Sequence, residues 1–237
     1  LTADDLSNQL ARPVQFLGNP FMDPVLPPTA LLSNTQPRIG LLPGSRRPEL
    51  EANLQLLLRL SDQLPDNNGI SLELALVSSL DDTGLERCAN GVGWQLRDGL
   101  LQRQGSPAVR VRRGAFQTVL QQSDLVISMA GTAAEQAVGL AKPVLQLPGQ
   151  GPQFTASFAE AQRRLLGPTV FCAPGDSGSQ DNLFASAELA LKLLKRIHHD
   201  LDFQKQCHTE AQRRLGSSGG GLRMASAIGG LCPSTAP

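Results

Sequence analysis

Short apolar runs of strand length alternate with helical patterns along most of this chain, and this alternation constrains the fold more than any other feature. The expected strands lie at residues 37–43, 71–79, 108–113, 123–128, 142–149 and 168–173. The expected helices lie at residues 48–64, 81–89, 114–122, 131–141, 153–166, 181–197 and 199–215. Such alternation is typical of βαβ units, in which helices cover both faces of a parallel sheet. The sequence therefore predicts an α/β fold with a doubly wound, Rossmann-like, mostly parallel sheet and C-terminal helices.

Composition shifts near both ends predict three regions. Residues 1–36 contain five prolines after position 10 and are expected to form a connector with the remnant of a preceding domain. Residues 37–215 are expected to form the α/β domain. Residues 216–237 are expected to form a Gly/Ser-rich linker, a short helix and a frayed tail. Because the first residue is Leu1 rather than methionine, we expect further chain upstream.

Charge and cysteine usage narrow the possible functions. The 237 residues carry 21 lysines and arginines against 21 aspartates and glutamates, so no net charge would attract nucleic acid. The four cysteines form no C-x-x-C pair, which argues against a zinc site and favours free thiols in a reducing compartment. Neither a signal peptide nor an apolar run of membrane-spanning length is present. These features predict a cytoplasmic protein with no metal site.

The stretch "PGSRR" joins the first expected strand to the first expected helix. Gly44 permits close backbone approach, Ser45 can cap the helix, and Arg46 can make a bidentate contact with a phosphate. An alternative is purely structural, with Ser45 as an N-cap and the two arginines paired with Glu49 and Glu51.

A second joint, "SMAGTAAEQ", places Ala130, Gly131 and Thr132 between a strand and a helix. Its backbone N–H groups could receive a phosphate, and Glu135 or Gln136 could hold the hydroxyls of a ribose. The structural alternative here is a capping box, in which Thr132 and Glu135 satisfy each other's backbone.

Two further loops are candidates, while familiar nucleotide motifs are missing. In "LPGQGPQ" two glycines flank Gln150, which could reach sugar hydroxyls, although a plain turn explains this loop equally well. In "RRGAF" the backbone of Gly114, Ala115 and Phe116 could border a nucleobase. The chain has neither a P-loop nor a strand-borne G-x-G-x-x-G.

Taken together, four segments resemble a known enzyme family. The segments "FLGNPFMDPV", "IGLLPGSRRPEL", "SDLVISMAGTAAEQAVGLAKPVLQLPG" and "FTASFAEAQRRLLG" resemble the C-terminal half of lipid-A-disaccharide synthase and its related proteins. These are glycosyltransferases of the two-domain GT-B type. The resemblance covers nearly the whole chain and rests on the order and spacing of short motifs.

The resemblance implies that residues 37–215 bind the UDP part of a nucleotide-sugar donor. Ser45 and Arg46 would face the diphosphate, Gly131 and Thr132 the phosphate and ribose, and Gly114 to Phe116 the uracil. It further implies an acceptor that can be a lipid or glycolipid, a catalytic base in a missing N-terminal domain, and no metal or other cofactor. A lipid acceptor would bring the full-length protein to the inner face of a membrane.

Two departures from the family pattern concern donor binding. Counted back from Pro143, the ribose-binding glutamate of the family falls on Gln136, with Glu135 one position earlier. The "GHP" turn of the family stands here as Gly18-Asn19-Pro20. A nucleotide-sugar epimerase of the same architecture and a non-catalytic nucleotide-binding or interaction module therefore remain alternatives to a glycosyltransferase.

Overall fold

The computed structural model describes residues 2–24, 36–66, 69–149 and 155–231. Within these residues the chain forms one eight-stranded sheet in the order β3-β4-β5-β2-β1-β6-β7-β8. The parallel strands are β1 (Arg38–Leu42), β2 (Ser71–Leu76), β5 (Val109–Arg113), β6 (Leu125–Ser128), β7 (Val144–Gln146) and β8 (Val170–Cys172). This confirms the predicted α/β class with a mostly parallel sheet.

The parallel strands run in a Rossmann-type order. From one edge to the other they are the third, second, first, fourth, fifth and sixth parallel strands of the chain. The order reverses between β1 and β6, which pair in register with Leu41 opposite Ile127. Ligands of open α/β sheets bind beyond the carboxyl ends of the strands at such a reversal.

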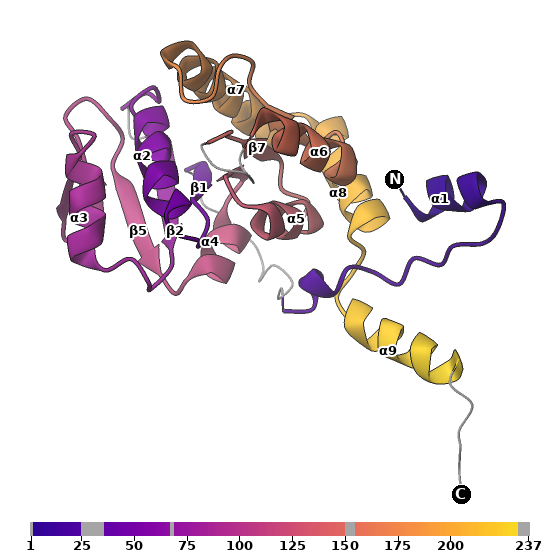
Figure 1. The fold of residues 1–237 in the computed structure, drawn as a ribbon. Coiled ribbons are helices and arrows are strands. Elements are labelled where there is room, and N and C mark those ends of the chain that lie inside the picture. The colour runs from indigo at the N-terminus through magenta and orange to yellow at the C-terminus, as the bar shows by residue number, and fades with distance from the viewer. Residues whose placement is uncertain (1, 25–35, 67–68, 150–154, 232–237) are drawn as a thin grey trace, which may run out of the picture.

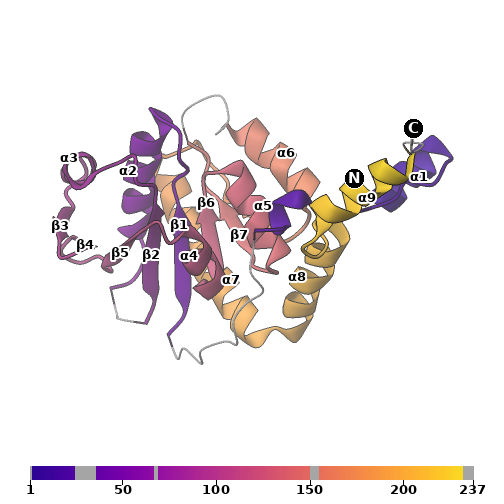
Figure 2. The same cartoon turned by 90° about the horizontal axis from the view of Figure 1, so that it is seen from below.

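Helices cover both faces of the sheet, and each face has its own hydrophobic core (Figures 1 and 2). One face carries α2 (Glu49–Ser61), α3 (Asp82–Asn90) and α7 (Gln180–His199). The other carries α4 (Phe116–Gln122), α5 (Gly131–Gly139) and α6 (Ala156–Leu166). Helix α8 (Leu201–Arg214) packs against α5 and α7. Strands β1, β2, β6 and β7 are mostly buried, as is expected for a parallel sheet with a layer of helices on each face.

The terminal elements lie at one side of this domain. Helix α1 (Ala3–Leu10) and helix α9 (Gly220–Leu231) extend beyond the sheet on the side of α8 (Figures 1 and 2). The short helix η1 (Pro20–Met22) packs against both α5 and α9. Asp23 accepts hydrogen bonds from the N–H groups of Gly219, Gly220 and Gly221 at 2.7–2.9 Å, which ties the start of α9 to η1.

Four elements were not predicted from the sequence. The antiparallel hairpin of β3 (Gln95–Arg97) and β4 (Leu100–Gln102) extends the β5 edge of the sheet. Its strands are only three residues long and largely exposed, so they lack an apolar run. Helix α1 and η1 lie in the region expected to be a connector, and no apolar periodicity marks them. None of the helices in the described part of the chain has the length and hydropathy of a membrane span.

Candidate functional site

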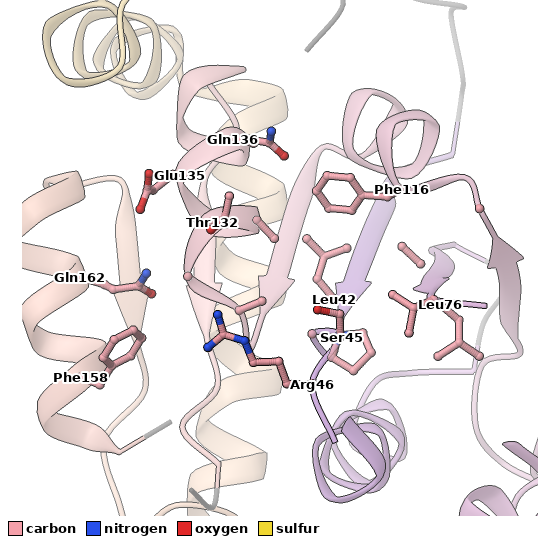
Figure 3. Close-up of a pocket in the computed structure, with 18 residues that line it drawn as sticks. Leu42, Ser45, Arg46, Leu76, Phe116, Thr132, Glu135, Gln136, Phe158 and Gln162 are labelled. Carbon is pink, nitrogen blue, oxygen red and sulfur yellow. The ribbon is translucent and has the colours of Figure 1, made fainter. Parts of the chain in front are cut away.

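A cavity of about 620 Å³ opens at the carboxyl ends of β1, β2, β5 and β6, where the strand order reverses (Figure 3). Its lining comes from the loops after these strands and from α4, α5 and α6. The described lining residues are Leu42, Pro43, Gly44, Ser45, Arg46, Ala75, Leu76, Val77, Gly114, Phe116, Ala130, Gly131, Thr132, Ala133, Glu135, Gln136, Phe158 and Gln162. Three of the four loops singled out from the sequence, those after β1, β5 and β6, thus meet at one place, whereas Pro148 and Gly149 of the fourth are not among the described lining residues.

The loop after β1 turns sharply and is held by a hydrogen bond from α2. Gly44 has a φ of 94°, a left-handed conformation that favours glycine. The buried side chain of Asn53 on α2 donates to the carbonyl of Pro43 at 2.9 Å. The loop therefore presents Ser45 and Arg46 at the mouth of the cavity, where both are exposed. The alternative in which Ser45 caps α2 is wrong, because α2 begins after Pro48 without a side-chain cap.

The loop after β6 brings the start of α5 to the same cavity. Ser128 holds the turn, since its Oγ donates to the carbonyl of Ala130 at 2.9 Å and accepts from the Ala130 N–H at 3.1 Å. Helix α5 begins at Gly131 without a side-chain cap, so the capping box expected from Thr132 and Glu135 is absent. The first N–H groups of a helix have no intrahelical partner. Gly131, Thr132 and Ala133 of this first turn line the cavity, and no side chain caps them.

The cavity has an apolar wall and a polar wall (Figure 3). Leu42, Leu76 and Phe116 lie on one side, near the ends of β1 and β2 and the start of α4. Arg46 and Thr132 lie on the side of α5 and α6, where Phe158 adds one aromatic ring, and the Arg46 guanidinium lies between the Ser45 loop and α6. A ligand that is apolar at one end and anionic at the other matches this division.

Glu135 and Gln136 line the cavity but also contact the segment before β1. Asn19 Nδ2 donates to Glu135 Oε2 at 3.1 Å. Gln136 Nε2 donates to the carbonyl of Phe21 at 2.7 Å, and its side chain is buried. The Gln136 amide therefore holds η1 against α5, a structural role that the sequence did not indicate.

Most of the predicted site residues line the cavity. Gly114, with a φ of 61°, and Phe116 border its apolar side. Ala115 precedes α4 as its N-cap residue and is not among the lining residues. Gln150 lies outside the described residues.

Sequence reasoning missed the contribution of α6. Phe158 and Gln162 project from this helix toward the start of α5 (Figure 3). Neither belongs to a Gly-rich loop or a strand end, and although both lie in the segment "FTASFAEAQRRLLG", the sequence analysis gave them no role. Their spacing of four residues, which places them on one face of a helix, was the available signal.

Charges in the cavity are few. Arg46 and Glu135 are the ionisable groups among its described lining residues. In the described part of the chain, no three His, Cys, Asp or Glu side chains gather in a way that could hold a metal ion.

No family model and no curated protein matches the chain in sequence, whereas solved structures match it in fold. One is a protein from Listeria monocytogenes assigned as UDP-N-acetylglucosamine 2-epimerase, with a TM-score of 0.56, 16% identity, and coverage of 90% of this chain and 52% of that one. Another is the spinosyn rhamnosyltransferase SpnG bound to the spinosyn aglycone, with a TM-score of 0.54, 15% identity, and coverage of 91% and 51%. A third is the calicheamicin glycosyltransferase CalG4, with a TM-score of 0.53, 16% identity, and coverage of 89% and 47%.

These neighbours are glycosyltransferases and an epimerase that share the GT-B architecture, and the chain spans about half the length of each. At these identities the likeness establishes the fold. The sheet order, the helices on both faces and the cavity at the strand reversal all agree with it. The chain therefore has the α/β Rossmann-like fold of one GT-B domain.

Proposed function

We propose that this domain binds the nucleoside diphosphate of a sugar donor and serves as the donor half of a glycosyltransferase. The observation that carries the proposal is the pairing, in one cavity, of the uncapped start of α5 with the Arg46 guanidinium. Helix N-termini and guanidinium groups are strong anion donors. Both would neutralise charge that develops on the departing diphosphate, which is electrostatic catalysis.

The apolar wall would receive the base and the ribose. Gly114 and Phe116 offer backbone and ring surface on the side away from Arg46. One of the similar structures, SpnG, was solved with thymidine diphosphate, at a TM-score of 0.50 and 15% identity. A pyrimidine base is therefore the expected choice, and UDP the first nucleotide to test.

Calorimetric titration with UDP, UDP-N-acetylglucosamine, dTDP, GDP and ADP tests the proposal. We expect saturable binding that prefers the pyrimidine nucleotides. Arg46→Ala should weaken it by about 1.5–3 kcal/mol, the contribution of a hydrogen bond to a charged group. Arg47→Ala is the matched control, because it removes the same charge from the next residue. Arg47 does not line the cavity and pairs with Glu51 at 3.0 Å.

Two results would contradict this assignment. The first is the lack of binding by any nucleotide at millimolar concentration, which would favour a module that keeps the fold without the chemistry. The second is an equal loss in the Arg46 and Arg47 variants, which would indicate nonspecific attraction. Binding should survive EDTA, since the proposal assigns charge neutralisation to Arg46 and α5 rather than to a metal ion.

The proposal extends to the full-length protein as the sequence resemblance suggests. A lipid-A-disaccharide-synthase-like activity would require an N-terminal domain that supplies the base and binds a lipid or glycolipid acceptor. Under this proposal the present chain binds the donor without turnover. A cytoplasmic location, with access to the inner face of a membrane, belongs to the same proposal.

A nucleotide-sugar epimerase is the second candidate, favoured by the likeness to the Listeria monocytogenes structure at a TM-score of 0.56. The two reactions differ in their need for an acceptor. Full-length protein given UDP-N-acetylglucosamine alone would change the configuration at C2 if it is an epimerase. It would leave the sugar unchanged if it is a transferase, and NMR of the sugar distinguishes the two.

A further inference from the structure

Two glutamines form a buried pair beside the polar wall of the cavity. Gln146 ends β7 with 5% of its surface exposed, and Gln162 lies on α6 with 8% exposed. Gln146 Nε2 donates a hydrogen bond to Gln162 Oε1. Long amide side chains seldom occupy such buried positions unless their hydrogen bonds are specified.

This pairing determines which end of the Gln162 amide faces the cavity. Its Oε1 is occupied by Gln146, so its Nε2 is the end left for a ligand. That nitrogen lies at the start of α5, because a Cβ on Gly131 would come within 2.9 Å of it. Figure 3 shows the Gln162 amide directed from α6 toward α5.

We propose that Gln162 donates from Nε2 to the diphosphate of the bound nucleotide, and that Gln146 is the residue that positions it. This inference rests on the proposed function and adds a third donor to Arg46 and the start of α5. A diphosphate would accept hydrogen bonds from Arg46, from the start of α5 and from Gln162 at the same time. A reversed Gln146 amide would instead turn Gln162 Oε1 toward the cavity, where it would repel a phosphate.

The absence of a side chain at position 131 supports this arrangement. Gly131 leaves space for Gln162 Nε2 directly above the first turn of α5. The amide therefore lies against the first turn of α5. Within the described residues Gln146 Oε1 is buried without a hydrogen-bond partner, so the bond from Gln146 Nε2 to Gln162 Oε1 is the contact that couples the two amides.

The test compares binding of UDP, inorganic pyrophosphate and uridine to the wild-type chain and its variants. Gln162→Met keeps the length of the side chain and removes the donor. We expect this variant to weaken the binding of UDP and of pyrophosphate by similar factors, roughly 10- to 100-fold. The affinity for uridine should not change. Gln162→Glu is a second, isosteric variant that can still accept from Gln146. Gln162→Glu should lose more affinity for the diphosphate than Gln162→Met does, because a carboxylate oxygen would face the phosphate oxygens.

A double-mutant cycle tests the positioning role of Gln146. Gln146→Met should lower the affinity for UDP when residue 162 is glutamine. It should have no further effect on that affinity in the Gln162→Met background. A purely structural role would produce the same loss in both backgrounds. Thermal unfolding of each variant without ligand separates a change in binding from a change in folding.

The outcomes distinguish this inference from the proposed function. If the wild type prefers UDP and both Gln162 variants bind it unchanged, the inference is wrong and the proposed function stands. If pyrophosphate binds as tightly as UDP and Gln162→Met weakens both, the diphosphate contact stands and the nucleotide assignment is wrong. If the wild type binds neither compound, both are overturned.

Discussion

Gly40 lies in the middle of β1, where α4 crosses the sheet closely. A Cβ at this position would collide with Ser123 Oγ and come within 3.3 Å of the Val119 side chain. Ser123 cannot easily move, because its Oγ donates to the carbonyl of Val119 at 2.6 Å and closes the end of α4. The close approach of strand and helix therefore depends on a residue without a side chain.

We expect Gly40→Ala to lower the free energy of unfolding by about 1–3 kcal/mol, the usual cost of overpacking a core. Urea denaturation measures the loss. Combining it with Ser123→Ala removes the colliding oxygen and should recover part of the stability relative to Gly40→Ala alone. A double variant that shows the plain sum of the two single losses would contradict this explanation.

Single residues also show where sequence reasoning about the site succeeded and failed. Glycines and small residues after apolar runs indicated that Gly44 and Gly131 lie at strand ends, and both line the cavity. Local patterns also suggested caps by Ser45 and Thr132, but neither side chain caps its helix. A capping pattern describes what a side chain can do, whereas α2 begins four residues after Ser45 and Thr132 already lies inside α5.

Among the elements, α9 depends on a single carboxylate for its start. Asp23 accepts from three consecutive N–H groups at the first turn of α9. The hydrogen bond from Gly221, followed by those from Gly219 and Gly220, holds the pKa of Asp23 below its usual value, against a smaller effect of desolvation. A negative charge at a helix N-terminus is also favoured by the helix dipole.

A lowered pKa in the folded state means that the stabilisation is present above the ordinary aspartate pKa and is lost as the pH falls through the folded value. The amide chemical shifts of Gly219–Gly221 should therefore titrate together, with a midpoint below that of an ordinary aspartate. In Asp23→Asn this titration should disappear. A titration that persists in the variant, or a wild-type midpoint above that of an ordinary aspartate, would assign it to another group.

The elements differ in how well their sequences reveal them. The parallel strands β1, β2, β6 and β7 are mostly buried runs between helices on both faces, so each is recognisable alone, whereas β5 carries the exposed Arg110 and Arg113. The β3–β4 hairpin depends on pairing with β5 at an exposed edge, where polar residues such as Gln95 and Arg97 are tolerated. Its stability comes from tertiary pairing, which a local pattern does not contain.

At the scale of the whole molecule, the segment before β1 is attached to the wall of the cavity through α5. Two neighbouring side chains make the attachment: Glu135 accepts from Asn19, and Gln136 donates to the carbonyl of Phe21. Met22 is buried against the same helix, near Gly139. These contacts join residues more than 110 positions apart, which explains why the sequence indicated only a connector here.

Gln136→Glu tests whether this attachment or a ribose contact explains residue 136. A carboxylate would place an acceptor against the Phe21 carbonyl in a buried site, so we expect a loss of about 1–3 kcal/mol in unfolding free energy. The loss should be largest at pH 8 and smaller at acidic pH, because a protonated carboxyl can donate to the carbonyl in place of the amide. Urea denaturation at both pH values measures it.

The neighbouring swap Glu135→Gln is the matched control, because an amide oxygen can still accept from Asn19 and the site is only half-buried. It should change stability by less than about 0.5 kcal/mol. If Gln136→Glu kept full stability at pH 8 and bound UDP more tightly, the hydrogen bond to Phe21 would be dispensable. Residue 136 would then act on the ribose, as the family resemblance implies for a glutamate at this position.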